Sequence, residues 1–276
     1  MSIPSIPVVG ARPSCSESSV LPIGIFAATR WELQAVRRAL PTDHVATVAG
    51  VRCHIGQSGD RAYWLIQTGV GPAAAGRVAR TVLATQAMSL VISTGFACAL
   101  APAQVGDLIL GTEVFPFNVE EAGMVKGDSL SCDEVVRSGC FAVAQDAGMV
   151  VRTGTVVSAP IVLWQAEDKR RLRRLTDAIG LDMESAAIAS AAREQGIPMA
   201  IVRTVSDLED EDLPLDFNLF LRPTGWVHGI WSLISRPSCL AGLNRLRRQS
   251  RVAADRLTEW FQHYADAGGG LRRVPR

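Results

Sequence analysis

The sequence lacks the spacings that mark most metal, redox and covalent-nucleophile sites. Its 276 residues hold only four histidines and six cysteines, without an HxxxH or a CxxC pair. No G-x-S-x-G elbow is present, so hydrolysis through a covalent serine is not supported. The net charge of +1 gives no overall attraction to nucleic acid. We therefore expect no metal, no cofactor and no nucleic-acid partner.

Long apolar runs are missing as well. No stretch is long enough to cross a membrane, and the first twenty residues have neither the basic start nor the apolar run of a secretory signal. Cys53, Cys98 and Cys140 have apolar or small neighbours, as reduced core cysteines do. These features predict a cytoplasmic protein in which residues 1–20 form a flexible leader.

Stretches rich in β-branched residues alternate along the chain with stretches whose apolar residues have helical spacing. This alternation predicts an α/β domain over residues 21–235, with a largely parallel or mixed central sheet covered by helices on both faces. Residues 116–150 give no clear prediction. Strands are predicted at 22–28, 61–68, 89–93, 105–115, 153–158 and 198–205, and helices at 29–40, 72–86, 167–178 and 182–195.

The C-terminal segment differs from the rest of the chain in its charge. Residues 236–276 hold nine arginines and three acidic residues, and helical spacing is predicted at 226–234 and 240–264. We expect a basic helical tail over 236–276, appended to the domain. A solvated helix face and a surface-binding segment both fit this composition.

A glycine-rich turn follows the strand predicted at 61–68. Residues 69–74, Gly-Val-Gly-Pro-Ala-Ala, fit G-x-G-x-x-A, a pattern that also opens dinucleotide-binding helices. Such a site needs an acidic residue about twenty positions later, but none lies between Asp60 and Asp107. A nicotinamide-dependent oxidoreductase is therefore a weak hypothesis. The turn can bring backbone N–H groups such as that of Gly71 to a ligand, or can simply need small residues.

Two carboxylates, Glu184 and Asp207, lie at the ends of neighbouring elements, where an α/β fold gathers its ligand groups. Glu184 lies in the first turn of an alanine-rich helix and can accept hydrogen bonds from two neighbouring hydroxyls. Asp207 follows the strand at 198–205, where it can face a ligand crevice or cap a helix. Glu32 ends a Thr-x-x-Glu capping box, and from the residues alone we favour capping as its role.

Together these motifs resemble the nucleoside phosphorylase and nucleosidase superfamily, which cleaves the bond between a base and its ribose. The similarity is greatest to 5′-methylthioadenosine/S-adenosylhomocysteine nucleosidases, and it covers about residues 22–212. The motifs that carry it are Ile23-Gly24-Ile25 with Glu32, Ser93-Thr94-Gly95-Phe96-Ala97, Val105-Gly106-Asp107, Asp182-Met183-Glu184 and Ser206-Asp207.

The resemblance implies an enzyme that releases adenine from a nucleoside, and it implies the roles of several residues. Asp207 would protonate N7 of the leaving base, Glu32 would activate the attacking water, and Glu184 would hold the ribose hydroxyls. Phosphate could replace water as a co-substrate, and a homo-oligomer is expected. The other substrate-binding residues implied are Met183, Phe96, Ala97, Val162, Ser206 and Gly71.

The chain departs from the nucleosidase pattern at a few positions. Phe96 and Cys98 stand where those enzymes usually have Ser and Gly, and residues 160–162 replace an Asp-Ala-Phe run. No arginine matches the phosphate site of the phosphorylases, which leaves Arg30 and Arg203 as the remaining candidates. A non-catalytic nucleoside-binding homologue is therefore an alternative hypothesis.

The segment after Asp207 has a narrower resemblance, to the hopanoid-associated phosphorylases. It implies removal of adenine from adenosylhopane, a lipid-linked nucleoside, with 5′-methylthioadenosine or S-adenosylhomocysteine as alternative substrates. A basic tail with several aromatic residues would suit the surface of the inner membrane, although packing on the domain is the simpler physical explanation. The residues concerned are 212–214, 221–225 and 235–237, with Trp226, Trp231, Trp260 and Phe261 as the aromatics.

Overall fold

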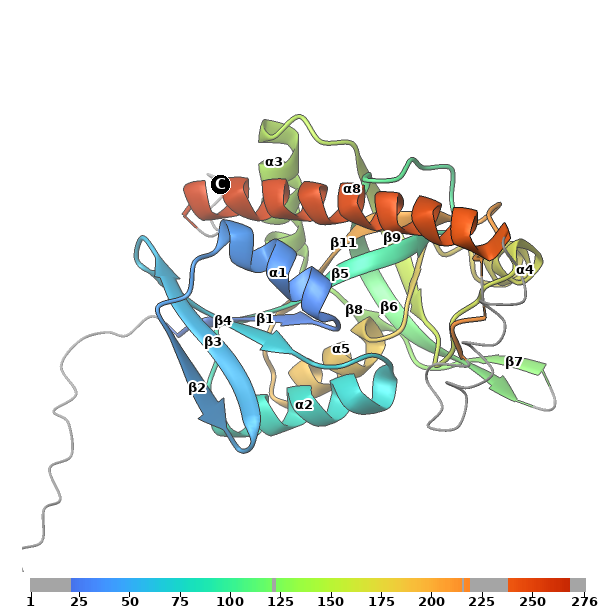
Figure 1. The fold of residues 1–276 in the computed structure, drawn as a ribbon. Coiled ribbons are helices and arrows are strands. Elements are labelled where there is room, and N and C mark those ends of the chain that lie inside the picture. The colour runs from blue at the N-terminus through green and yellow to red at the C-terminus, as the bar shows by residue number, and fades with distance from the viewer. Residues whose placement is uncertain (1–20, 121–122, 215, 219–237, 269–276) are drawn as a thin grey trace, which may run out of the picture.

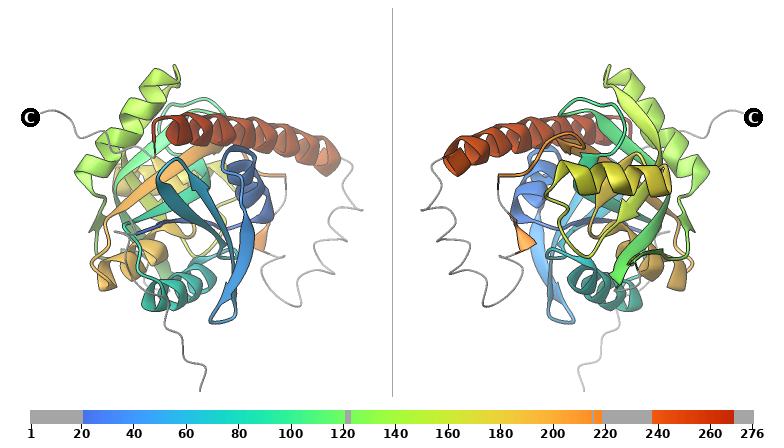
Figure 2. Two further views of the ribbon diagram at one scale, coloured as in Figure 1. Left: turned by 90° about the vertical axis from the view of Figure 1, so that its left-hand side faces the viewer. Right: turned by 90° about the vertical axis from the view of Figure 1, so that its right-hand side faces the viewer.

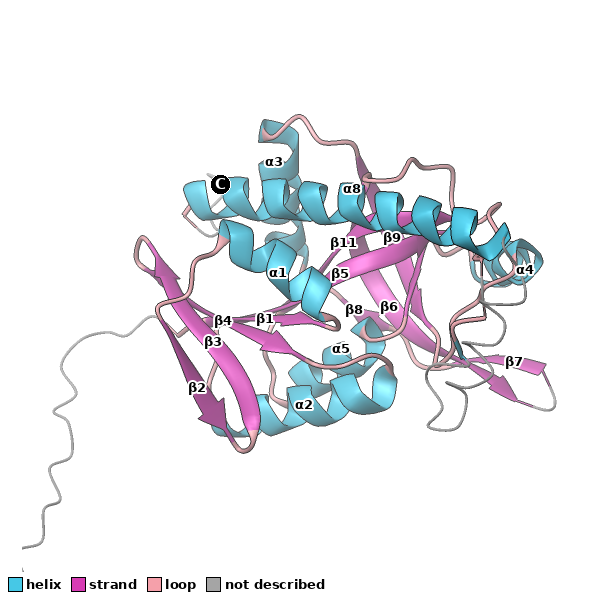
Figure 3. Cartoon of the chain, viewed as in Figure 1, coloured by secondary structure: helices cyan, strands magenta, loops and turns pink. Residues whose placement is uncertain are grey.

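A mixed β-sheet organises the part of the chain that the computed structural model describes, which is residues 21–120, 123–214, 216–218 and 238–268 (Figure 1). The predicted leader at 1–20, the predicted helix at 226–234 and the predicted boundary between 235 and 236 lie outside these residues. Helices cover both faces of the sheet, as the sequence predicts (Figure 3).

The described elements alternate along most of the chain. The strands are β1 (Ile23–Ala27), β2 (His44–Val48), β3 (Val51–Ser58), β4 (Arg61–Gln67), β5 (Leu90–Ala99), β6 (Leu108–Glu120), β7 (Gly123–Lys126), β8 (Leu130–Ser131), β9 (Val151–Ser158), β10 (Gly180–Asp182) and β11 (Met199–Leu208). The helices are α1 (Arg30–Ala39), α2 (Pro72–Thr85), α3 (Glu134–Asp146), α4 (Ala166–Thr176), α5 (Ser185–Glu194) and α8 (Ser238–Asp266).

The sheet has the order β10-β9-β6-β11-β5-β1-β4-β3-β2, with β7 and β8 paired to β6. Parallel pairs join β1, β4, β5 and β11, whereas β6 runs antiparallel to β11. Because β10 pairs with both β9 and β5, the strands β10, β9, β6, β11 and β5 close into a ring. The sheet is therefore mixed, which is the second of the two predicted arrangements.

Several elements were not predicted from the sequence. The edge strand β2 is mostly exposed, so its sequence carries no buried pattern. The helix α3 falls in residues 116–150 and was missed although its buried residues Val136, Cys140, Val143 and Ala144 have helical spacing. The strands β7 and β8 in the same stretch are short. Their partner β6 extends to Glu120, five residues beyond the predicted end of that strand.

Two layers of helices bury the two faces of the sheet. The helices α1, α3 and α8 lie on one face, and α2 and α5 lie on the other (Figure 2). Side chains of β1 alternate between these layers, because Ile23 and Ile25 belong to the α1–α8 cluster and Phe26 to the α2–α5 cluster. The helix α4 covers the end of the sheet at β6 and β9, where Leu172 joins a third cluster with Phe115.

The long helix α8 is part of the core rather than a free tail. Its residues Leu257, Trp260, Phe261 and Tyr264 recur at the spacing of one helical face and are all buried. The ring of Trp260 lies 4.8 Å from that of Phe261 and 5.0 Å from that of Tyr264 between centroids. The expectation that Trp260 and Phe261 face a membrane is therefore wrong, because both fill the α1–α8 layer. None of the helices described could span a membrane.

The cysteines predicted to be core residues are buried. Cys53, Cys98 and Cys140 are free thiols with almost no exposed surface. Burial raises the pKa of the Cys140 thiol to about 12 and that of Cys53 to about 11, so both remain neutral at physiological pH.

The packing of α8 predicts that truncating the side chain of Trp260 strongly destabilises the protein. Because this side chain is completely buried (0% exposed), Trp260→Ala should lower the free energy of unfolding by about 3–5 kcal/mol. Urea denaturation of the full chain measures the loss. The control is Val252→Ala on the same helix, whose side chain is exposed (45%) and whose loss should stay within about 0.5 kcal/mol. Equal effects of the two substitutions would show that α8 is not part of the core.

Candidate active site

Two adjacent parallel strands, β5 and β11, carry four of the predicted site residues, Phe96, Ala97, Ser206 and Asp207. Arg203 pairs with Gly95 in their register, and Asp207 pairs with Cys98. The register shifts between Val205 and Asp207, which marks a β-bulge in β11. Bulges re-aim the side chains that follow them, so this irregularity sets the direction of Asp207.

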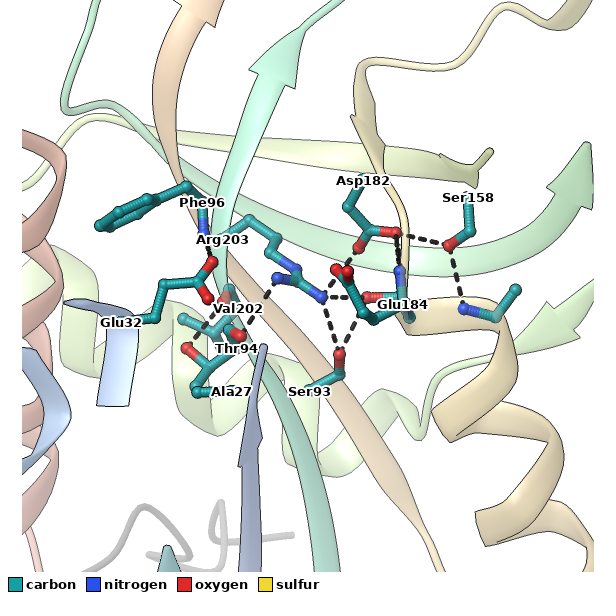
Figure 4. A network of polar contacts seen from close by, with 12 residues as sticks. Ala27, Glu32, Ser93, Thr94, Phe96, Ser158, Asp182, Glu184, Val202 and Arg203 are labelled. Carbon is teal, nitrogen blue, oxygen red and sulfur yellow. Dashed lines mark hydrogen bonds and ion pairs between the residues drawn. The ribbon is translucent and has the colours of Figure 1, made fainter. Parts of the chain in front are cut away.

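Arg203 is the centre of a buried polar network (Figure 4). Its Nη2 lies 3.0 Å from Asp182 Oδ2, and both side chains are only 1% exposed. The same nitrogen donates to the hydroxyls of Ser93 and Ser185, and Nη1 donates to the carbonyl of Thr94 at 3.1 Å. The Nε–H is buried and has no hydrogen-bond partner among the described residues, so it is available to a ligand.

Asp182 also fixes the start of helix α5. Its Oδ1 accepts hydrogen bonds from the backbone N–H groups of Glu184 and Ser185, each at 3.2 Å. The hydroxyl of Ser158 donates to Asp182 and accepts from the N–H of Ala186. The helix therefore begins at Ser185 and not at 182, and Glu184 is the N-cap residue. The prediction that Glu184 lies in the first turn is wrong, because β10 extends through Asp182.

Glu184 is held against the glycine-rich turn before α2. Its Oε1 accepts from the backbone N–H of Gly71 at 2.7 Å, and Gly71 has φ +90°, a conformation that favours glycine. The turn thus presents an N–H group to a carboxylate. Burial raises the pKa of Glu184 to about 7; Arg203 acts against this shift, and the charges of Asp182 and Glu32 add to it.

Glu32 caps α1, as the residues alone predict, and also binds the backbone of β5. Its Oε2 completes the capping box of α1 by accepting from the N–H of Thr29 at 2.7 Å. Its Oε1 accepts from the N–H of Phe96 on β5 at 2.8 Å. A Cβ at Gly95 would lie 2.2 Å from Glu32 Oε1 and 2.6 Å from Arg203 Nη1, so both side chains converge on this glycine. The capping carboxylate therefore also faces the buried network.

Asp207 lies beyond the bulge and is bound from two sides. The hydroxyl of Ser206 donates to Oδ1 at 2.9 Å, and the ammonium of Lys169 lies 2.8 Å from Oδ2. The same ammonium donates to the carbonyls of Leu208 at 3.1 Å and Glu211 at 3.0 Å. Lys169 is completely buried (0% exposed side chain), so the loop after β11 is anchored to α4 through one cation.

Lys169 was not predicted from the sequence. The only signal was its spacing, because Ala166, Lys169 and Leu172 recur every three residues and form the buried face of α4. Desolvation is the largest influence and acts against the ammonium, but the charge and hydrogen bond of Asp207, together with contributions from Cys98 and Glu211, outweigh it and raise the pKa of Lys169. This lysine is therefore a buried cation paired with the predicted catalytic acid.

Three predicted substrate-binding residues remain to be placed, Val162, Ala97 and Met183. The backbone N–H of Val162 donates to Asn218 Oδ1, and its carbonyl accepts from Asn218 Nδ2, both at 2.8 Å. Ala97 is buried on β5, where its carbonyl accepts from Ser206 Oγ at 3.4 Å. Met183 is partly buried beside Glu184. The amide of Asn218, which the sequence did not indicate, occupies both backbone groups of Val162.

The acidic run at 209–212 is bound to neighbouring elements. Glu209 pairs with Arg173, and Glu211 accepts from the side chain of Gln249 at 2.8 Å. Asp212 accepts from the N–H of Ala166 at 2.8 Å, at the start of α4. Within the described ranges, no group of three or more His, Cys, Asp and Glu side chains is placed to hold a metal ion.

Known proteins are similar to this chain in sequence or in fold. The curated 5′-methylthioadenosine/S-adenosylhomocysteine nucleosidase of Haemophilus ducreyi is 28% identical over 211 residues, covering 73% of this chain and 91% of the relative. The solved nucleosidase of Neisseria meningitidis superposes with a TM-score of 0.67 and 20% identity, over 88% of this chain and 99% of that one. The native futalosine hydrolase of Helicobacter pylori superposes with a TM-score of 0.67 and 18% identity, over 87% of this chain and 97% of that one. At these identities the two structural likenesses concern the fold alone.

Fold, site and relatives together define an enzyme of the nucleoside phosphorylase and nucleosidase class. The sequence profile of the family described as the phosphorylase superfamily matches residues 22–222, which is most of the chain. The chain belongs to the phosphorylase superfamily.

The buried ion pair predicts a large difference between two arginine substitutions. Arg203→Met leaves Asp182 charged and unpaired in the interior, and should lower the free energy of unfolding by about 3–5 kcal/mol. Arg38→Met removes a pair with Asp255 whose side chains are 52% and 68% exposed, and should cost at most about 1 kcal/mol. Urea denaturation of both variants measures the difference. Similar losses in the two would contradict the central position of the buried pair.

The raised pKa of Glu184 predicts that the stability of the fold depends on pH. The pKa of Glu184, about 7 in the folded protein, exceeds its ordinary value of 4.5, so between these pH values the folded state keeps a proton that the unfolded state has lost. Raising the pH from 4.5 to 8 should therefore lower the stability of the wild type relative to Glu184→Gln by about 3 kcal/mol. Denaturant unfolding of both proteins across this range measures the difference. A constant difference across the range would contradict the raised pKa.

Proposed function

We propose that this enzyme hydrolyses the N-glycosidic bond of an adenine nucleoside and releases adenine. The observation that carries the proposal is the placement of two polar clusters beside the paired strands β5 and β11. One contains Glu32, Glu184 and Arg203, and the other contains Asp207 with Ser206. Arg203 lies opposite Gly95 and Asp207 opposite Cys98, three residues apart on β5, which is about 10 Å along a strand. A single nucleoside can therefore place its ribose at one cluster and its base at the other.

Asp207 is the acid that we assign to the leaving group. When the bond from C1′ breaks, its electron pair goes to the base, and a proton on N7 neutralises the charge that develops there. General acids of this kind contribute about 10²–10⁴-fold to rate. Asp207 is nearly buried, and its Oδ1 is oriented by Ser206, so its direction is fixed before the substrate binds.

Glu184 and Glu32 are the groups that we assign to the ribose side. Two acceptor oxygens let Glu184 bind neighbouring hydroxyls of the ribose, and its negative charge stabilises the electron-poor ring in the transition state. Glu32 faces the same network from the opposite end and would orient and deprotonate the attacking water. The unpaired Nε–H of Arg203 is an additional donor for that water or for a ribosyl oxygen.

The charge of the ribose cluster favours water over phosphate as the nucleophile. Arg203 is paired with Asp182, and Glu32 lies close enough to Glu184 for its charge to add to the raised pKa of Glu184. One cation among three carboxylates is a poor site for a phosphate dianion. Arg30, the other candidate, is exposed at the start of α1.

The backbone of Val162 supports adenine as the base. Its N–H and C=O point to the same side chain, since the carboxamide of Asn218 pairs with both. A 6-aminopurine presents the same pair of groups, an acceptor at N1 and a donor at the 6-amino nitrogen. A 6-oxopurine presents the reverse pair and could not replace the carboxamide of Asn218 on the backbone groups of Val162.

For the 5′ substituent we propose the hopanoid chain of adenosylhopane. Support comes from the sequence resemblance after Asp207 and from the exposed arginines of α8, among them Arg247, Arg248 and Arg251. The second candidate is 5′-methylthioadenosine, favoured by the curated relative from Haemophilus ducreyi. Adenine release from each compound, with and without phosphate, distinguishes the candidates when the products are analysed by mass spectrometry. A phosphorylated sugar would contradict hydrolysis, and no adenine from either compound would contradict the proposed function.

Asp207→Asn tests the proposed acid. The amide cannot donate a carboxyl proton, so kcat for adenine release should fall by at least about 10²-fold while binding of the nucleoside persists. Steady-state kinetics and isothermal titration measure the two effects. Asp255→Asn, an exposed position on α8, is the control and should leave kcat unchanged. Activity of Asp207→Asn close to the wild type would remove Asp207 from the mechanism.

A further inference from the structure

We propose that Lys169 is the proton reservoir of Asp207, and that its ammonium supplies the proton which Asp207 gives to the leaving base. This inference rests on the proposed function, because it concerns the acid that we assign to the leaving group. Lys169 does not face the ribose cluster and acts only through Asp207. It is therefore a positioning and proton-supplying residue behind the acid.

The geometry gives Lys169 one partner that can accept its proton. Its three N–H donors are directed to Asp207 Oδ2 at 2.8 Å and to the carbonyls of Leu208 and Glu211 at 3.1 and 3.0 Å. Carbonyl oxygens do not take up a proton at physiological pH, whereas a carboxylate does. Because the side chain of Lys169 is 0% exposed, the carboxylate of Asp207 is its outlet toward the substrate.

The other ionisable groups around Lys169 do not compete for this proton. Cys98 on β5 lies against both Lys169 and Asp207, and burial raises its pKa well above the usual range, so it remains a neutral thiol. Glu211 faces Lys169 with its backbone carbonyl, while its carboxylate accepts from Gln249. One turn further along α4, Arg173 is paired with Glu209.

The proton transfer starts from the ion pair, in which Asp207 is a carboxylate and Lys169 is an ammonium. The ammonium of Lys169 first gives a proton to Oδ2 of Asp207, which leaves a neutral amine and a carboxylic acid. The bond from C1′ to the base then breaks, its electron pair goes to the base, and the carboxylic acid delivers its proton to N7. Asp207 ends as a carboxylate, Lys169 ends as a neutral amine, and the base leaves as neutral adenine. Water gives its hydroxyl to C1′ and its proton to Glu32, and solvent later returns a proton to Lys169.

Burial makes the ammonium of Lys169 dependent on Asp207. In a desolvated site an ammonium is disfavoured, and the charge of Asp207 is the largest influence that opposes this effect. Any step that neutralises the carboxylate therefore weakens the hold of Lys169 on its proton. An exposed lysine would keep its proton in either case.

A purely structural role for Lys169 is the competing explanation, because its contacts also fix the loop at 208–211. Two substitutions separate the roles. Lys169→Arg keeps a positive charge and several donors, but a guanidinium does not give up its proton. Lys169→Met removes the charge and keeps a similar length. Arg173→Met is the matched control, because it removes another cation between α4 and the same loop without touching Asp207.

The experiment measures adenine release from 5′-methylthioadenosine by the full chain between pH 5 and 10. We expect kcat of both Lys169→Met and Lys169→Arg at pH 8 to fall by about 10²-fold or more, with KM changed less than about three-fold. The activity of Lys169→Met should recover as the pH is lowered, because Asp207 must then take its proton from solvent. Arg173→Met should keep the wild-type profile. Wild-type kcat and pH profile in Lys169→Arg would overturn the proposal in favour of a structural role.

A second measurement does not depend on turnover. Nitrogen-15 NMR of the Lys169 side chain in the wild type and in Asp207→Asn follows the ionisation of the ammonium directly. We expect the pKa of Lys169 to fall below its ordinary value in Asp207→Asn, because burial remains and the opposing charge is lost. An unchanged pKa would overturn the proposal. A wild type that releases no adenine would refute the proposed function, and the NMR titration would then still decide whether Lys169 depends on Asp207.

Discussion

The ion pair between Arg203 and Asp182 is the interaction on which the rest of the site depends. It joins β11 to the end of β10, and Asp182 in turn caps α5 and holds the backbone of Glu184. Two desolvated charges are stable only while both are present, since either one alone would be a buried unpaired ion. The pair therefore imposes one relative position on the strands that carry the site and on the helix that carries Glu184.

Several groups in this enzyme serve the fold and the proposed chemistry with different atoms of the same side chain. Glu32 caps α1 with one oxygen and reaches β5 with the other. Lys169 anchors the loop after β11 through two carbonyls and pairs with Asp207 through its third donor. Preorganisation of this kind is effective because the rotamer of each group is already fixed by structural bonds, so little entropy is lost when substrate binds.

Much of the fold followed from patterns in the sequence. The capping box at Thr29 and Glu32 placed α1, and the buried runs of β1, β4 and β11 placed those strands within three residues. The missed strands β2, β7 and β8 are short or exposed, so their residues carry no periodic apolar signal. The helix α3 was also missed, although its buried residues have helical spacing. The aromatic residues of α8 were visible in the sequence, but which surface they cover depends on the layer against which the helix packs.

The sequence by itself determined the α/β class, the family resemblance and the identity of the carboxylates, because these depend on local spacing and on short motifs. Only the tertiary structure decided that Arg203 is neutralised by Asp182, that Asp207 is paired with Lys169, and that Trp260 fills the core. These contacts join residues that are far apart in the chain or lie on different elements. Their energies come from burial and from the geometry of opposite charges, and neither exists until the strands and helices have packed.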